Sequence, residues 1–283
     1  MTAGETSRGL LELMRPVNVI AASVLTFIGA FVAGGVADYP LEVITAVAAT
    51  GLAVGAGNAI NDYFDREIDR INQPDRAIPR GAVSPRGALA FSLVLFAAAV
   101  VLAVTLPAPA VAIAAINLAA LVAYTEFFKG LPGLGNALVA YLVGSTFLFG
   151  AAAVGDMGPA VILFVLSAIA TVTREIIKDV EDLEGDREEG LNTLPIAIGA
   201  RRALQVAAAL LVAGVLASPI PYLLYFGVPY LLIVLPADAI MLYAAFESFE
   251  DPTAGQSHLK YGMFLAALAF IAGRAATAVP GSI

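Results

Sequence analysis

Residues 58–81 read NAINDYFDREIDRINQPDRAIPRG, and they directly follow a stretch, 41–57, in which Glu42 is the only charged residue. An apolar segment of about 20 residues is long enough to cross a bilayer as a helix. The abrupt change from apolar to charged residues therefore predicts a membrane-spanning helix whose end carries a group of aspartates and arginines.

The composition of the whole chain agrees with a membrane protein, because 60% of the residues are hydrophobic and only 13% are charged. We expect an all-α, polytopic membrane helical bundle of about nine transmembrane helices, built as a single domain over residues 1–283, with a central cavity open to the cytoplasmic side. The candidate spans are 17–37, 41–62, 86–106, 108–127, 133–154, 158–178, 201–217, 219–247 and 258–279. Four prolines within 218–236 predict a broken or tilted helix there.

The basic residues predict the orientation of the chain, since short loops rich in Lys and Arg stay in the cytoplasm. With a cytoplasmic N-terminus, all of the 15 Lys and Arg residues except Arg274 fall on the cytoplasmic side. We therefore expect a multi-pass protein of the cell membrane with its polar site facing the cytoplasm. A net charge of −8 suits a high-salt cytoplasm.

The first acidic motif, NDYFDREID, spaces Asn61, Asp65 and Asp69 four residues apart, and Asp62 falls beside Asp69 on a helical wheel. One helix face therefore carries three carboxylates and an amide at the end of the second span.

A second acidic motif, REIIKDVEDLEGD, puts Asp179, Asp182 and Asp186 on one helix face at the end of the sixth span. Each motif continues into a polar loop, AIPRG after the first and NTLPIAIG after the second. The chain thus contains a weak internal repeat, with Asp-rich motifs after the second and sixth helices.

Carboxylates that share a helix face repel one another, and hard divalent cations offset this repulsion. Mg²⁺ prefers carboxylate oxygens, water and substrate phosphates. The predicted metal ligands are Asn61, Asp62, Asp65, Asp69, Asp179, Asp182 and Asp186. The predicted phosphate contacts are Arg76, Arg80, Lys129, Arg174 and Lys178. A charged site at the mouth of an apolar bundle favours an amphiphilic substrate, and an isoprenyl diphosphate fits, with its hydrocarbon tail among the helices.

At these motifs the sequence resembles the UbiA-type membrane prenyltransferases. Their first motif, NDxxDxxxD, corresponds to Asn61, Asp62, Asp65 and Asp69, and their second, DxxxD, corresponds to Asp182 and Asp186. The resemblance implies a nine-helix layout and catalysis in which Asp65, Asp69, Asp182 and Asp186 hold Mg²⁺-diphosphate.

Further stretches of the chain also fit the family. They are MRPVN with Arg15 and Asn18, DRAIPRG with Arg76, and YTEFFKGLPGLGN with Tyr124 and Lys129. The resemblance implies that these residues contact the substrate. Four residues separate Tyr124 from Lys129, whereas the family motif often has three.

Within the family, the motifs most resemble members that use geranylgeranyl diphosphate and a lipid acceptor. That resemblance implies transfer of a geranylgeranyl group to the hydroxyl of geranylgeranylglyceryl phosphate, which forms the second ether bond of archaeal lipids. The alternative acceptor is aromatic, such as 4-hydroxybenzoate or a quinone or chlorophyll-type precursor.

Two other classes of membrane protein use intramembrane carboxylates. Transporters usually place them near the bilayer midplane, where this chain has only Asp238. The signature of a CDP-alcohol phosphotransferase, an Asp-Gly pair followed by Ala-Arg, does not occur in either motif. His258, the single histidine, is expected in a solvated turn. We expect no nucleic-acid partner, and the sequence leaves the oligomeric state open.

Overall fold

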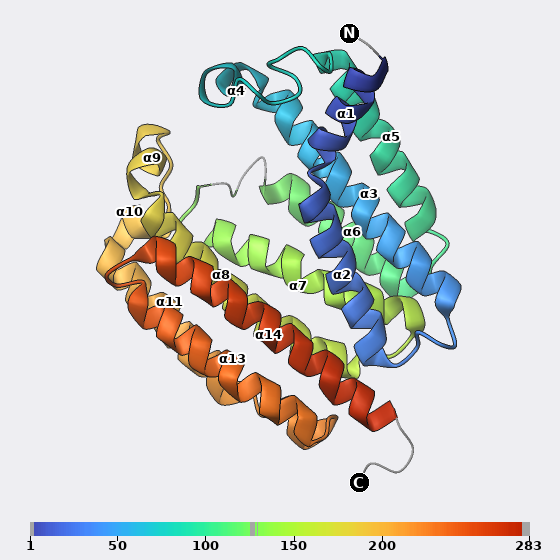
Figure 1. Cartoon of the computed structure of the whole chain (residues 1–283), viewed down its shortest axis with the longest axis vertical. Coiled ribbons are helices and arrows are strands. Elements are labelled where there is room, and N and C mark those ends of the chain that lie inside the picture. The colour runs from blue at the N-terminus through green and yellow to red at the C-terminus, as the bar shows by residue number, and fades with distance from the viewer. Residues whose placement is uncertain (1–2, 125–127, 129, 279–283) are drawn as a thin grey trace.

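The computed structural model describes residues 3–124, 128 and 130–278, and all of its regular elements in that part of the chain are helices. In chain order they are α1 (Ala3–Met14), α2 (Pro16–Ala33), α3 (Pro40–Phe64), α4 (Arg66–Asn72), α5 (Pro85–Ala103), α6 (Ala108–Ala123), α7 (Leu134–Val154), α8 (Gly158–Glu181), α9 (Leu183–Glu188), α10 (Leu194–Ile198), α11 (Ala200–Ala217), α12 (Ile220–Leu224), α13 (Val228–Glu247) and α14 (Pro252–Ala278). Figure 1 shows the long helices side by side, with the short helices α4, α9 and α10 at one end.

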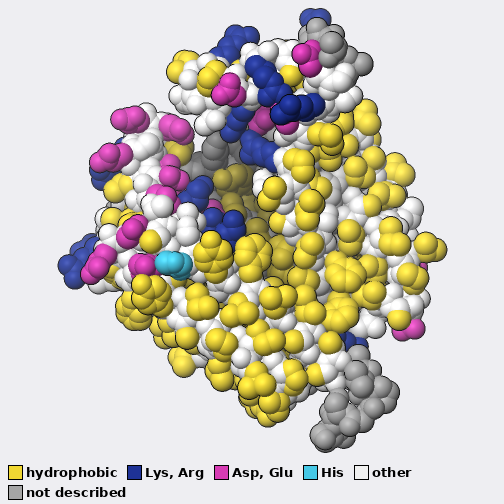
Figure 2. Space-filling model, in the orientation of Figure 1, with side chains coloured by type: hydrophobic (Ala, Val, Ile, Leu, Met, Phe, Trp, Pro, Cys, Tyr) yellow, Lys and Arg dark blue, Asp and Glu magenta, His cyan; other side chains and the backbone are white. Residues whose placement is uncertain are grey.

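The long helices confirm an all-α membrane bundle. Eight helices of the described chain are long and apolar enough to cross a membrane, and α6 is a shorter apolar helix. Many of their large apolar side chains are exposed, as expected for a surface that faces lipid. Figure 2 shows hydrophobic side chains over most of this face, with most charged side chains gathered at one end around a hollow. A count of nine crossings stays a prediction.

The proline-rich stretch is broken, as the sequence predicts. After α11 ends at Ala217, the five-residue helix α12 and a short turn precede α13, which contains Pro236. Proline lacks an N–H and clashes with the preceding helical turn, so a straight helix through this stretch is unfavourable.

Two glycines let α2 and α7 approach closely. A Cβ atom added at Gly29 would lie 2.1 Å from the carbonyl oxygen of Phe147, and one at Gly150 would lie 1.9 Å from that of Thr26. No larger side chain fits at either position without moving backbone. Small residues at helix contacts are typical of membrane bundles, and here they fix α2 against the centre of the molecule.

Asp238, which had no explanation in the sequence, has a structural role. Its buried carboxylate accepts a hydrogen bond from the Ser218 hydroxyl at 2.5 Å, and the Tyr230 hydroxyl donates to the Ser218 carbonyl at 2.7 Å. These contacts fasten the end of α11 to α13 across the break. The prediction that His258 lies in a solvated turn is wrong, because this residue lies within α14, where it is half-buried and pairs with Glu247, with 2.5 Å between Nδ1 and Oε2.

The predicted orientation is testable because the chain contains no cysteine. Gln73 and Asn192 are exposed at the end that carries α4 and α9, whereas Asp38 is exposed in the turn between α2 and α3. We expect Gln73→Cys and Asn192→Cys to react with an impermeant thiol reagent only from the cytoplasmic side. Asp38→Cys should react only from outside. Labelling of Gln73→Cys from outside would reverse the topology.

Candidate active site

Both acidic motifs lie where a long helix meets a short one, and their backbones are alike. Asp65 stands between α3 and α4 with φ −81° and ψ 1°, and Asp182 stands between α8 and α9 with φ −87° and ψ 7°. The helical hydrogen bonds continue through both junctions, because Asp65 N donates to Asn61 O at 2.8 Å and Asp182 N donates to Lys178 O at 2.9 Å. The motifs therefore stay on nearly continuous helices, each with one distorted residue.

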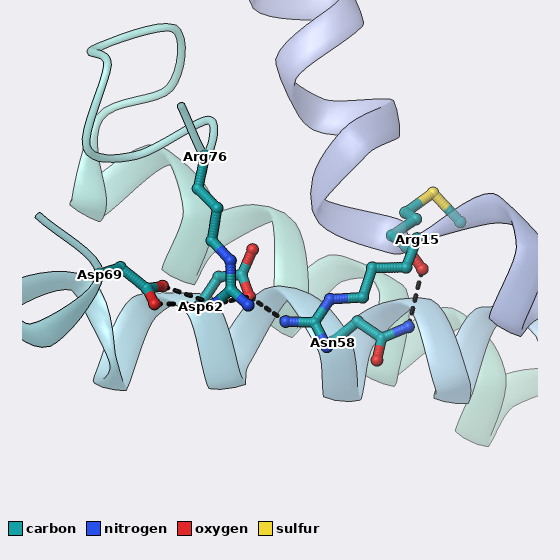
Figure 3. Close-up of polar contacts among 6 residues, drawn as sticks. Arg15, Asn58, Asp62, Asp69 and Arg76 are labelled. Carbon is teal, nitrogen blue, oxygen red and sulfur yellow. Dashed lines mark hydrogen bonds and ion pairs between the residues drawn. The ribbon is translucent and has the colours of Figure 1, made fainter. Parts of the chain in front are cut away.

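In the first motif, Asp62 is 5% exposed and is held by an arginine from the start of α2. Arg15 Nη2 donates to Asp62 Oδ1 at 2.6 Å (Figure 3). Arg15 has φ 53°, and within the described residues it is the sole non-glycine with a positive φ. A left-handed conformation strains an L-residue by roughly 1–3 kcal/mol. The proline that follows Arg15 further disfavours helical φ and ψ angles at this residue. In this strained backbone conformation, the guanidinium of Arg15 contacts Asp62.

Asp69 is equally buried and is held by Arg76 from the loop after α4. Arg76 Nη1 lies 2.9 Å from Asp69 Oδ1 and 2.7 Å from Oδ2, and it also lies 3.6 Å from Asp62 Oδ1 (Figure 3). One arginine thus lies between the two buried carboxylates of the motif. Since a buried charge without a partner is strongly destabilising, these ion pairs make the acidic helix end compatible with its apolar surroundings.

The helix α1 is joined to the same loop. Arg80 forms an ion pair with Glu12, donates to the carbonyl of Asp75 at 2.6 Å, and through its hydrogen bond lowers the pKa of the Glu12 carboxyl. In addition, Asn58 Nδ2 donates to the carbonyl of Met14 at 2.8 Å (Figure 3). Arg80 was predicted as a phosphate contact, but here it anchors α1.

The second motif uses neutral hydrogen-bond donors instead of arginines. Asn136 Nδ2 on α7 donates to Asp179 Oδ2 at 2.8 Å, and Thr193 Oγ1 donates to Asp186 Oδ2 at 3.1 Å. Lys178 Nζ is 3.8 Å from the exposed carboxylate of Asp182. The negative charge of this motif is therefore less compensated than that of the first.

Arg174 lies one helical turn before Lys178 on α8. Its guanidinium donates to Glu175 at 3.0 Å and to Gln256 on α14 at 2.9 Å, while its Nε is buried without a partner among the described residues. Arg174 therefore ties α8 to α14 beside the second motif.

Three other predicted residues have weaker structural support. Asn61 and Asn18 are exposed, and neither side chain forms a hydrogen bond within the described residues. Tyr124 is half-buried and lies within electrostatic range of Glu175 and Asp179. Lys129 lies outside the described residues.

Five residues near the motifs were not predicted from the sequence. They are Glu12, Asn58, Asn136, Thr193 and Gln256. Each joins the site through a contact with a distant segment or loop. Three of them had a nearby signal in the sequence. Asn58 precedes the first motif by one helical turn, Asn136 ends the quoted stretch YTEFFKGLPGLGN, and Thr193 lies in the quoted stretch NTLPIAIG.

The donor atoms of the two motifs suit a hard divalent cation. Asp65 has no cationic partner in the described part of the chain, and the charge nearest Asp182 is 3.8 Å away. Among the described residues, no three acidic or histidine side chains converge closely enough to hold a metal by themselves. Mg²⁺ is usually bound by one or two carboxylates together with water and substrate phosphates. The arrangement therefore fits a metal that binds together with a phosphate ligand.

Comparisons with known proteins identify the family of the chain. Residues 22–268 match the model of the UbiA prenyltransferase family. The chain is 65% identical to a digeranylgeranylglyceryl phosphate synthase of Natronomonas pharaonis over 274 residues, which cover 96% of this chain and 99% of that protein. A Halobacterium salinarum protein of the same name is 61% identical, with the same coverage of both proteins.

Two solved structures have a similar fold. One, from a study of digeranylgeranylglyceryl phosphate synthase in membranes, superposes with a TM-score of 0.84 at 38% identity and covers 95% of this chain and 99% of its own. The other is a UbiA homologue of Archaeoglobus fulgidus bound to GPP and Mg²⁺, with a TM-score of 0.73 at 19% identity, covering 96% and 100% of the two chains.

The strained backbone of Arg15 gives a prediction about stability. Arg15→Ala and Arg15→Gly both remove the guanidinium, but only glycine adopts a positive φ without strain. We expect the glycine variant to have the higher free energy of unfolding, by about 1 kcal/mol, with both below the parent protein. Thermal or denaturant unfolding in detergent measures this difference. Equal stability of the two variants would show that the left-handed conformation costs nothing.

Proposed function

The chain belongs to the UbiA prenyltransferase family, and on that premise we propose that it transfers a geranylgeranyl group from geranylgeranyl diphosphate to the hydroxyl of geranylgeranylglyceryl phosphate. The observation that carries this proposal is the 65% identity, over nearly the whole of both chains, to a protein named digeranylgeranylglyceryl phosphate synthase. The product in that name contains two geranylgeranyl groups and one phosphate. A diphosphate donor and a phosphate-bearing acceptor account for both.

The diphosphate of the donor binds between the two acidic motifs. Asp65 and Asp69 on one side, and Asp182 and Asp186 on the other, would hold Mg²⁺ together with the phosphate oxygens. Asp62 and Asp179 lie one helical turn before Asp65 and Asp182. When bound, Mg²⁺ neutralises the charge that develops on the departing diphosphate. The A. fulgidus homologue bound to GPP and Mg²⁺ supports a metal-diphosphate ligand for this fold.

The cationic side chains at the rim stabilise the leaving group. Arg76 already lies between Asp62 and Asp69, so its remaining N–H groups are positioned for phosphate oxygens that approach the motif. Lys178 and Arg174 are further candidates on the opposite side, and Lys129 is a candidate from the sequence motif alone. As the allylic C–O bond breaks, its electron pair goes to the diphosphate oxygen.

The hydroxyl oxygen of the acceptor then bonds to the allylic carbon and loses its proton, so that an ether forms. The carbocation must be protected from water, and the hydrophobic side chains that line the hollow in Figure 2 provide such walls below the charged rim. The same apolar surface accommodates the tail of the donor.

Acceptor identity and metal dependence are tested together with purified protein in liposomes. We expect Mg²⁺-dependent transfer of labelled geranylgeranyl from its diphosphate to geranylgeranylglyceryl phosphate, and none to 4-hydroxybenzoate offered in parallel. Chelation should abolish transfer and added Mg²⁺ should restore it. Transfer to the aromatic acid alone would establish the aromatic-acceptor alternative, and gradient-driven uptake without diphosphate release would indicate a transporter.

The role of the aspartates is tested by neutral substitutions. We expect Asp65→Asn and Asp182→Asn each to lower kcat by at least ~100-fold, because each removes a charged ligand that acts on the departing diphosphate. The free energy of unfolding of each variant in detergent should stay close to that of the parent protein, since the amide has the same shape as the carboxylate that it replaces.

Matched controls remove a carboxylate from each of the short helices that follow Asp65 and Asp182. Glu67 on α4 and Glu184 on α9 are both exposed. Glu67→Gln and Glu184→Gln should retain near-normal turnover. Normal turnover of both aspartate variants would exclude the site proposed here.

A further inference from the structure

An apolar groove runs between α2 and α3. It has a volume of about 690 Å³. Its walls include Val19, Ser23 and Phe27 on α2 and Val47, Ala48 and Gly51 on α3, and Met14 lies at one end. Bulk is limited at Gly51, where an added Cβ atom would lie 2.9 Å from Ser23 Oγ. The shape and lining fit an extended hydrocarbon chain.

The groove leads to the first acidic motif. At about 100° per residue, Ala48 and Gly51 lie on the same face of α3 as Asn58 and Asp62, within a sector of about 80°. A chain lying along this face with its polar end toward α4 therefore reaches Asn58 and Asp62.

Met14 separates the groove from the polar residues. An added Cβ atom at Gly55 would lie 2.8 Å from Met14 Cε, so this side chain covers α3 between the groove and the motif. The backbone carbonyl of Met14 accepts the hydrogen bond of Asn58, and the next residue, Arg15, binds Asp62. Methionine is unbranched and flexible, so its side chain adapts to a ligand that passes over it.

The proposed reaction brings together two geranylgeranyl chains, so two apolar spaces are needed. The hollow and the groove between α2 and α3 differ in the polar residues that lie next to them. The hollow in Figure 2 opens at the charged rim, where a diphosphate held by both motifs leaves its tail. Of the residues that line the groove, Met14 lies nearest the first motif in the chain, directly before Arg15. A ligand in the groove therefore has a head group at Arg15 and Asn58, which suits a phosphate monoester with a hydroxyl better than a diphosphate that needs both motifs.

We propose that the groove between α2 and α3 binds the geranylgeranyl chain of the acceptor, with its glycerol phosphate end at Arg15. This inference rests on the proposed function, since it assumes an alkylglyceryl phosphate acceptor. It assigns the acceptor's hydrocarbon chain to the groove and the donor's to the hollow.

A binding experiment tests the groove without relying on turnover. In the cysteine-free chain, Ala48→Cys places a thiol in the groove, and Val24→Cys places one on the exposed surface of α2 outside it. We expect geranylgeranylglyceryl phosphate to slow alkylation of Ala48→Cys in detergent at least tenfold. Butylglyceryl phosphate, which has a short chain, and geranylgeranyl diphosphate should not slow it. Val24→Cys should react at one rate throughout.

Each other result overturns the assignment. Protection of Ala48→Cys by geranylgeranyl diphosphate would place the donor tail in the groove. Equal protection by the butyl compound, or none by any ligand, would mean that no acceptor chain binds there and that ordinary lipid or detergent fills the groove.

A kinetic experiment provides the second readout. Ala48→Phe fills the groove, so it should raise KM for geranylgeranylglyceryl phosphate about tenfold while KM for butylglyceryl phosphate and for the donor stays unchanged. Val24→Phe is the control and should change none of these values. If the parent protein transfers geranylgeranyl to neither glyceryl phosphate, the proposed function fails, whereas the alkylation result still decides what the groove binds.

Discussion

The structure depends on keeping carboxylates at the end of apolar helices neutralised. Asp62 and Asp69 are both 5% exposed, and each is paired with an arginine that comes from outside α3 and α4. Removing either cation would leave a buried charge, at a cost of roughly 3–5 kcal/mol. The position of α1, the strained backbone of Arg15 and the path of the loop through Arg76 and Arg80 all serve this pairing.

The two acidic motifs share a backbone conformation but differ in the side chains that pair with their carboxylates. Asp65 and Asp182 occupy equivalent junctions with nearly the same dihedral angles. Around them, the first motif is paired with arginines, whereas Asp179 and Asp186 of the second accept hydrogen bonds from an amide and a hydroxyl. The arginines therefore offset more of the negative charge of the first motif than the neutral donors offset in the second.

The sequence predicted the bundle, the break in the proline-rich stretch and the helix ends that carry the motifs, because these follow from hydropathy, proline chemistry and helical spacing. It did not predict partners that meet through tertiary packing. Asn136 pairs with Asp179 across 43 residues and Gln256 with Arg174 across 82, and no spacing in the sequence indicates either pairing. That Asn61 acts with the aspartates on its helix face stays a prediction, since its exposed side chain forms no hydrogen bond within the described residues. A single distorted residue at Asp65, and the resulting direction of α4, are likewise set by the loop that follows.

The order of these contacts along the chain bears on how the protein is made. The ion pairs of the first motif join residues from 12 to 80, so Arg15 has already left the ribosome when Asp62 follows it 47 residues later. For Asp62, the growing chain thus supplies the cation before the carboxylate, whereas Arg76 follows Asp69 by 7 residues. Arg174, in contrast, receives Gln256 only when α14 is synthesised. The first half of the polar network therefore assembles early during translation, and the second half is completed by the last helix to leave the ribosome.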